Sequence, residues 1–166
     1  MIIAVAATMM AFALTILSDL GESSKLAAAA REVERELQSA RLKAVTVNRL
    51  LRVRINCPAT GYFRTVEVLG NTTDQATNRC VPSNYPFPAP DQDIMTRPNF
   101  DGPVRIVPDG TTVTSQVLEF RPDGTAAQVV SNVAQNIATT VTITVTRKGK
   151  SKTVTVNGAG KVVLAQ

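Results

Sequence analysis

The stretch MIIAVAATMMAFALTIL, residues 1–17, decides how the rest of this chain can be arranged. It carries no charged residue, and its hydroxyl side chains are limited to Thr8 and Thr15. As a helix it would be about 25 Å long, close to the roughly 30 Å hydrocarbon core of a bilayer. We therefore predict a hydrophobic helix over residues 1–22. Its predicted contacts with lipid or with other helices come from Ile2, Ile3, Val5, Met9, Phe12, Leu14, Ile16 and Leu17.

A cleaved signal and a buried core helix both fit residues 1–17 less well than a membrane anchor does. A cleaved secretory signal begins with basic residues and ends at a small-residue cleavage site, yet no Lys or Arg precedes Lys25. A buried core helix would need protein on every face, and a domain of this size could hardly surround it. A single membrane anchor is the better interpretation.

A second helical pattern follows, from Ser23 to about Arg52, and Gly21 is a plausible bend between the two. Its apolar residues recur at alternating spacings of four and three, which predicts one narrow stripe. The stripe consists of Leu26, Ala30, Val33, Leu37, Ala40, Ala44, Val47 and Leu51. A two-stranded coiled coil would use such a stripe, but the β-rich sequence that follows favours a helix packed on a sheet.

The remainder of the chain alternates apolar and polar residues in short runs separated by Pro, Gly and Asn. We predict strands at 51–56, 62–69, 104–107, 112–121, 125–130, 139–147, 152–156 and 161–164, with loops at 70–79 and 81–103. The fold class is therefore α+β, with one long N-terminal helix packed on an antiparallel meander. The predicted globular domain covers residues 23–166, comprising the amphipathic helix 23–52 and a β-rich head 53–166.

The two cysteines indicate where the head resides. Cys57 ends a strand-like run and Cys80 closes a polar loop, so we expect a disulfide rather than two buried free thiols. It would stabilise the fold by about 3 kcal/mol and would place the head outside the cytoplasm. The basic residues that follow the apolar run predict the opposite orientation. Both patterns agree if a basic leader once preceded Met1, and that is our hypothesis.

The composition argues against an enzyme. The chain has no histidine, which removes the commonest general base and the commonest metal ligand. Asp91 and Asp93 lie in a predicted loop, where solvation accounts for them better than catalysis does. We therefore expect no cofactor, no metal and no small-molecule substrate.

One group of residues suggests an anionic partner, in a chain whose formal net charge is +5. Arg147, Lys148, Lys150 and Lys152 surround a predicted hairpin tip, where all four would project into solvent, with Lys161 alongside them. A solubilising turn that blunts an edge strand is the simpler interpretation. The functional alternative is contact with DNA phosphates or with an acidic partner.

Three stretches resemble the GspH/FimT-type minor pilins and pseudopilins of type IV pili and type II secretion systems. They are the two-part helix at 1–51, the helix-to-strand junction SARLKAVTVNRLLRVRINCP at 39–58, and the pair LEFRPDGTA at 118–126 and TVTVNGAGKVVL at 153–164. The last pair is similar to that family's F-x-P-x-G turn and its closing strand after a glycine. The resemblance covers most of the chain and is weakest over the proline-rich residues 81–103.

Two features depart from that family. Its cleavage signature, a glycine and a phenylalanine followed by a glutamate five residues into the mature chain, is absent, and Met1 would fall just after that glutamate. DNA-binding members carry a basic G-R-x-R motif, where this chain has Gly160-Lys161-Val162-Val163.

The resemblance implies a structural subunit that sits in the inner membrane as a single-pass protein with a periplasmic head. It implies that the subunit later joins a pilus or pseudopilus filament with other pilin or pseudopilin subunits, and that the chain is methylated. The alternatives are a DNA-uptake minor pilin that uses the basic hairpin, and a membrane-tethered periplasmic binding domain that does not polymerise.

Overall fold

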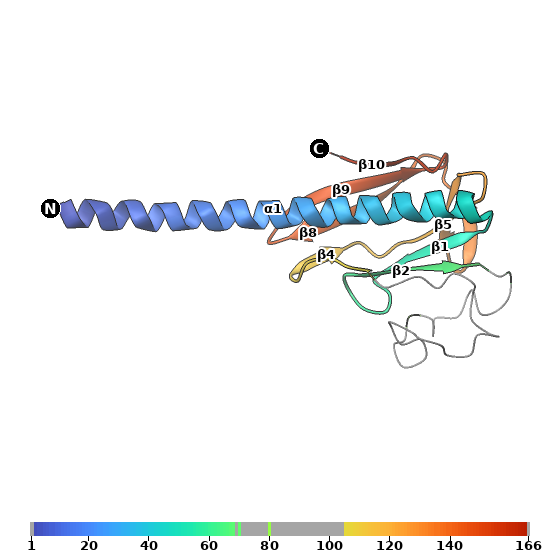
Figure 1. The fold of residues 1–166 in the computed structure, drawn as a ribbon, viewed down its shortest axis with the longest axis horizontal. Helices are drawn as coiled ribbons and strands as arrows, with labels where there is room; N and C mark the ends of the chain where they lie inside the picture. Colours follow the sequence, from blue (N-terminus) through green and yellow to red (C-terminus); the bar gives the residue numbers. More distant parts are fainter. Residues whose placement is uncertain (1, 69, 71–79, 81–104, 166) are drawn as a thin grey trace.

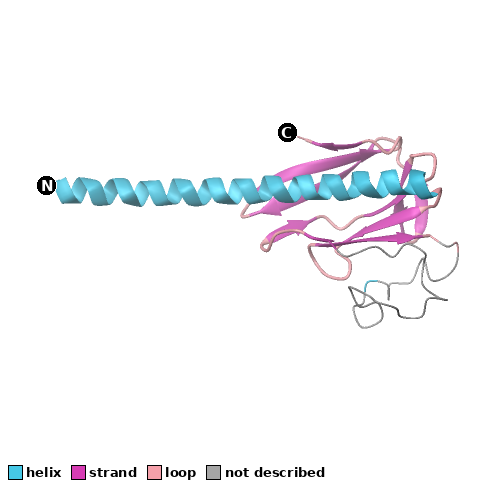
Figure 2. Ribbon diagram, viewed as in Figure 1, coloured by secondary structure: helices cyan, strands magenta, loops and turns pink. Residues whose placement is uncertain are grey.

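The computed structural model describes residues 2–68, 70, 80 and 105–165, and the side chains of these residues except 2–20 and 105. One helix, α1 (Ile2–Val47), runs without interruption through Gly21. Its first half extends away from the head, and its second half lies along the β-strands (Figures 1 and 2). Among residues with described side chains, no helical stretch is long and apolar enough to cross a membrane. The side chains of the predicted apolar segment 1–17 lie outside that set.

Helix α1 ends five residues earlier than predicted. Asn48 adopts a left-handed conformation with φ 52°, and its N–H donates to the carbonyl of Val45 at 3.3 Å. The N–H of Arg49 donates to the carbonyl of Ala44 at 3.1 Å. These two bonds form a Schellman cap, which satisfies carbonyls in the last turn and turns the chain into the first strand. Asparagine is less common than glycine at this position, which accounts for the overrun of the sequence pattern.

The strands form two antiparallel sheets rather than one continuous meander. The six-stranded sheet has the order β3-β2-β1-β5-β6-β7 and the four-stranded sheet β10-β9-β8-β4. The first contains β1 (Leu51–Ile55), β2 (Tyr62–Glu67), β3 (Arg105–Ile106), β5 (Val117–Phe120), β6 (Ala126–Val130) and β7 (Val133–Asn136). The second contains β4 (Thr111–Val113), β8 (Thr140–Arg147), β9 (Lys150–Asn157) and β10 (Val162–Leu164). The α+β class is as predicted.

The predicted strand 112–121 divides between the two sheets. Its first part, β4, pairs with β8, and its second part, β5, pairs with β1. Thr114 donates its N–H to the carbonyl of Thr144, and the carbonyl of Gln116 accepts from Ile55, so the chain crosses from one sheet to the other within three residues. Strand β7 was not predicted. It follows a two-residue turn in which Ser131 and Asn132 both have positive φ.

Helix α1 contacts both sheets, through β1 and β5 in one and β8, β9 and β10 in the other. The buried stripe comprises Leu26, Ala29, Ala30, Val33, Leu37, Ala40 and Ala44, which confirms the predicted face up to the cap. Val47, predicted to continue the stripe, is 41% exposed, and Leu51 belongs to β1. The small alanines let the helix approach the strands closely, while Leu37, Val33 and Phe120 fill the space between the layers.

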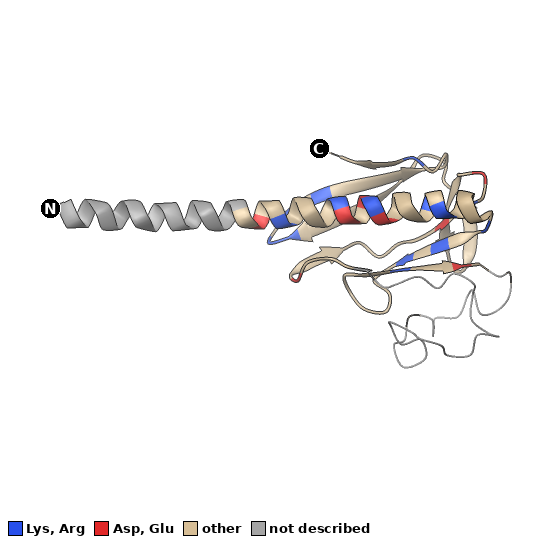
Figure 3. Ribbon diagram, viewed as in Figure 1, with Lys and Arg blue, Asp and Glu red and all other residues tan. Residues whose placement is uncertain are grey.

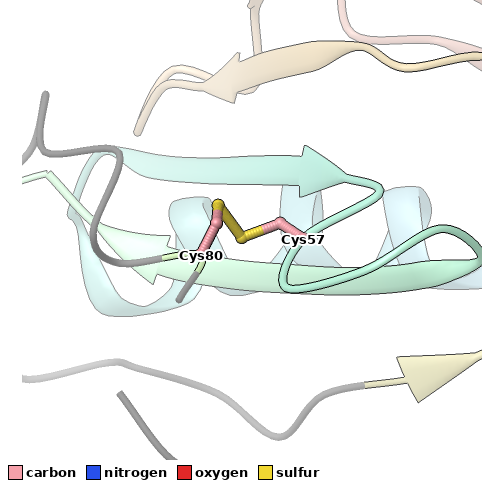
Figure 4. The surroundings of a disulfide bond; sticks show 2 residues. All are labelled: Cys57 and Cys80. Carbon is pink, nitrogen blue, oxygen red and sulfur yellow. A yellow bond between two sulfur atoms is a disulfide. The ribbon is translucent and has the colours of Figure 1, made fainter. Parts of the chain in front are cut away.

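The disulfide between Cys57 and Cys80 is present, as predicted (Figure 4). Cys57 lies two residues after the end of β1 and is almost completely buried. The predicted loops at 70–79 and 81–103 lie outside the described residues apart from Gly70. Cys80 separates these two predicted loops in the sequence, and the disulfide attaches it near the end of the central strand β1.

Candidate functional site

The charged residues nearest the projecting half of α1 meet at Glu22. Its carboxylate accepts a hydrogen bond from Nε of Arg147 at 2.6 Å, across 125 positions of sequence. Nη1 of Arg147 also donates to the carbonyl of Asp109 and, at 3.2 Å, to Oγ1 of Thr111. The prediction that Arg147 projects into solvent is therefore wrong, because the residue is only 9% exposed and ties β8 to the helix and to the β3–β4 turn.

Lysines surround the same carboxylate at longer range. Nζ of Lys25 lies 3.5 Å from Glu22, and Nζ of Lys148 lies 3.8 Å from it. Their side chains are 57% and 67% exposed, so both ammonium groups remain largely in water. Lys150 is exposed and pairs across the hairpin with Arg147, which places both residues on the face of the sheet toward α1.

The hairpin tip is tighter than predicted. Lys148 and Gly149 both have positive φ and form a two-residue turn, and β9 resumes at Lys150. We call Lys25, Lys148 and Lys150 the basic collar, because they lie at the end of the head from which the first half of α1 emerges (Figure 3).

The other two predicted basic residues do not join this collar. Lys152 is two residues after Lys150 on β9 and therefore lies on the same face of the sheet. It stands opposite Val145 and is half-buried. Lys161 lies before β10, beyond the opposite end of β9, where it shares a groove with Arg41 and Leu42. Since β9 has eight residues at about 3.3 Å each, Lys161 is some 25 Å from the tip and not beside it.

The Arg147 hydrogen bond is the main reason that the pKa of Glu22 lies below its usual value of 4.5. Burial opposes this shift, and the charges of Arg147, Lys148 and Lys25 add to it. Glu22 is therefore ionised at neutral pH, and the contact between α1 and β8 is a true ion pair. Glu22 was not among the residues predicted from the sequence, and its one local signal was the spacing of three residues to Lys25.

A second junction holds the other end of α1 to the head. Nε of Arg41 donates to the carbonyl of Gly124 at 2.9 Å, and Nη2 reaches the carbonyl of Ala159 at 3.4 Å. Gly124 closes the turn between β5 and β6, and Ala159 lies in the turn between β9 and β10. The two motifs singled out in the sequence, FRPDG and NGAGK, therefore meet at one arginine. No sequence signal marked Arg41, because its partners are backbone carbonyls.

The described residues hold no group of three or more Cys, Asp or Glu side chains placed to bind a metal ion. The charged sites of the described head are instead contacts between elements. The contacts of Glu22 with Arg147 and of Arg41 with the Gly124 carbonyl fix the direction in which α1 leaves the head, so their role is structural.

A long N-terminal helix that projects from a head of antiparallel sheets defines the pilin-like class. FimU, a type IV minor pilin of Pseudomonas aeruginosa, has a similar fold with a TM-score of 0.52 at 17% identity, over 89% of this chain and 92% of that chain. The minor pseudopilin EpsH from the Type 2 Secretion System of Vibrio cholerae gives 0.49 at 14% identity, over 85% and 96%.

The family model of the type II transport protein GspH matches residues 29–160, which is most of the chain. The chain belongs to the GspH family, as the sequence resemblance implied. No curated protein sequence matches it significantly.

Proposed function

We propose that this chain is a minor pilin or pseudopilin subunit that waits in the inner membrane and then enters a pilus or a secretion pseudopilus. In this proposal residues 1–22 anchor it as a single-pass protein with the head in the periplasm. The observation that carries the proposal is the unbroken helix Ile2–Val47, whose first half extends beyond the head and is apolar in sequence. A rod of this kind needs an apolar environment that its own head does not supply.

Lipid and sister helices can each supply that environment. Lipid tails are as apolar as the helix itself, so association inside a filament depends on close packing rather than on escape from water. Small side chains allow such packing, and residues 4–13 include Ala4, Ala6, Ala7, Ala11 and Ala13. When the subunit moves from the membrane into a filament, the angle between the head and α1 stays fixed. The Glu22–Arg147 and Arg41–Gly124 contacts hold α1 to the head at two places.

Cysteine cross-linking tests assembly. Single cysteines replace Ala6 or Ala13 in cells that express the complete secretion or pilus machinery. We expect dimers and higher ladders that contain this chain and its neighbours after oxidation, and no ladder from a cysteine at the exposed Ser151. Membrane-bound protein that resists alkaline extraction but yields no intersubunit product at either position would instead identify a tethered domain that does not polymerise.

DNA uptake is the second candidate, and the exposure of Lys148 and Lys150 at the hairpin tip is what supports it. It rests on fewer residues than the sequence predicted, since Arg147 is engaged and Lys161 is remote. Replacing both lysines by Glu should remove an electrophoretic shift of duplex DNA at low salt, because phosphate contacts are strongly salt-dependent. A shift unchanged by the double replacement would exclude the hairpin as a DNA contact.

A further inference from the structure

We propose that the basic collar, Lys25, Lys148 and Lys150, binds the phosphate headgroups of anionic lipids while the subunit waits in the membrane. The inference rests on the proposed anchoring by residues 1–22 and adds a ligand class to it. Its starting point is the position of the collar, at the end of the head where α1 begins to project (Figure 3).

The depth of the collar suits headgroups. Glu22 follows Leu17, the last residue of the apolar run, by five positions, which is about 7.5 Å along a helix. The polar layer of each leaflet is about 5–8 Å thick. With the apolar run in the hydrocarbon core, the cations around Glu22 therefore lie at the level of the phosphates.

The Glu22–Arg147 ion pair fixes this depth. The 2.6 Å bond joins the helix to the end of β8, one residue before the hairpin tip. Arg147 is held a second time by the carbonyl of Asp109 and by Oγ1 of Thr111. The tip therefore cannot swing away from the membrane surface without breaking a partly buried, hydrogen-bonded ion pair.

The collar keeps positive charge available after this pairing. Arg147 makes the short contact with Glu22, whereas Lys25 and Lys148 stand at 3.5 and 3.8 Å, beyond good hydrogen-bond distance. A phosphate oxygen can approach both exposed ammonium groups from the membrane side. Glu22 and the exposed Asp109 reduce the local field, so the collar is a modest attractor in which each lysine strengthens binding about fivefold.

Lipid fits this geometry better than DNA. A duplex bound at the tip would have to lie against the membrane, and the remaining predicted cation, Lys161, is at the other end of the head. Lipid phosphates are already present in the plane where the three lysines lie. The collar is also small, which suits individual headgroups more than the many phosphates that DNA-binding surfaces contact.

The test uses the full chain in vesicles. A fluorophore is attached to Ser151→Cys, next to Lys150, with the Cys57–Cys80 disulfide left oxidised. The phosphatidylcholine vesicles carry an equal small fraction of a quenching lipid, either phosphatidylglycerol or phosphatidylcholine, with its spin label near the top of the acyl chain so that the headgroup is unmodified. We expect spin-labelled phosphatidylglycerol to quench more strongly than the same fraction of spin-labelled phosphatidylcholine, because the collar gathers the anionic lipid around the hairpin at an unchanged depth. Lys148→Gln with Lys150→Gln should reduce the quenching to the phosphatidylcholine value, whereas Lys161→Gln should leave it unchanged.

Each result has one meaning. Protein that washes out of both vesicle types in alkaline carbonate overturns the proposed anchoring. Protein that stays embedded but is quenched equally in both overturns the lipid site and leaves the anchoring standing. If the two lysines are needed to bind duplex DNA but not for the phosphatidylglycerol-dependent quenching, the collar is a DNA contact and the lipid proposal is wrong.

Discussion

Gly160 lies so close to the carbonyl oxygen of Gly124 that a Cβ atom on Gly160 would overlap that oxygen. The two glycines belong to turns in different sheets, and the side chain of Arg41 lies against both of them. The N–H of Ala126 also donates to the carbonyl of Gly158 at 3.0 Å. The contact therefore joins the six-stranded sheet, the four-stranded sheet and α1 at one point.

Replacing Gly160 by Ala should lower the free energy of unfolding by about 3 kcal/mol. The loss has two causes, because the alanine would be held in a left-handed conformation and its Cβ would overlap the Gly124 carbonyl oxygen. Gly160 has φ 72°, and Nε of Arg41 is the next atom that the new Cβ would meet. Denaturant unfolding of the full chain in detergent measures the change. The matched control is Gly149→Ala, where φ is 76° but nothing lies within 4 Å, and there we expect only about 1 kcal/mol. Equal losses at the two positions would show that the overlap is relieved at no cost.

Arg52 and Glu119 form a buried ion pair across β1 and β5, with Nη2 and Oε2 2.8 Å apart. Arg52→Met should cost about 3–5 kcal/mol, because it leaves the Glu119 charge in a buried site. The double variant Arg52→Met, Glu119→Leu should recover much of this loss, and a double-mutant cycle measures the coupling. The exposed pair Arg35–Glu32 is the control, where Glu32→Gln should cost less than about 1 kcal/mol. A double variant no more stable than Arg52→Met would show that the stranded Glu119 charge is not the cause of the loss.

The contact between Glu22 and Arg147 should make part of the head's stability depend on pH. The folded-state pKa of Glu22 lies below 4.5, so its contribution is complete above the unfolded-state pKa. It should disappear as the pH falls through the lower, folded-state value. The denaturation midpoint of Glu22→Gln should therefore lie below that of the wild type at pH 7, and the two should converge in acid. Glu32→Gln serves as the exposed control. A gap that stays constant down to the acid limit would argue against the ion pair.

Removing the disulfide should destabilise the head by about 3 kcal/mol on the chain-entropy model, since the two cysteines are separated by 23 positions. Cys57→Ala with Cys80→Ala measures this loss by denaturant unfolding. A reducing agent should lower the stability of the wild type by a similar amount and should leave the double variant unchanged. A wild-type protein that reductant does not affect would show that the bond adds no stability.

Leu37 and Leu42 lie on opposite faces of α1. Leu37 is fully buried, and Leu37→Ala should cost about 2–5 kcal/mol because it leaves a cavity between the helix and the sheets. Leu42 is 68% exposed, so Leu42→Ala should change the unfolding free energy by less than about 0.5 kcal/mol. Both variants are measured by denaturant unfolding of the full chain. Similar losses would mean that the two faces are assigned wrongly.

Local pattern was enough for the elements that carry strong periodicity. The stripe from Leu26 to Ala44 and the alternation of β8 were predicted close to their observed limits, because burial on one face leaves a regular signal. The helix end at Val47 and the strand β7 were missed. Both depend on asparagines in left-handed conformations, Asn48 and Asn132, a conformation that asparagine adopts less often than glycine.

The basic hairpin shows what the sequence could not convey. Four neighbouring cations suggested one solvent-exposed cluster, because no acidic residue is near them in sequence. Folding brought Glu22 to Arg147 from 125 positions away and left Lys161 at the far end of β9. Of these neighbouring cations, Arg147 is thus held in a partly buried ion pair, whereas Lys148 and Lys150 remain exposed.

Side-chain periodicity along the chain is sufficient to predict the α+β fold class. An apolar run, an amphipathic helix and a series of alternating strands can be recognised in the sequence, because each pattern depends on residues that are close together along the chain. The division of the strands between two sheets, and the charges that hold α1 to the head, became apparent only in the folded chain. Those choices depend on contacts between residues far apart in sequence, whose free energy depends on the packing of the whole head.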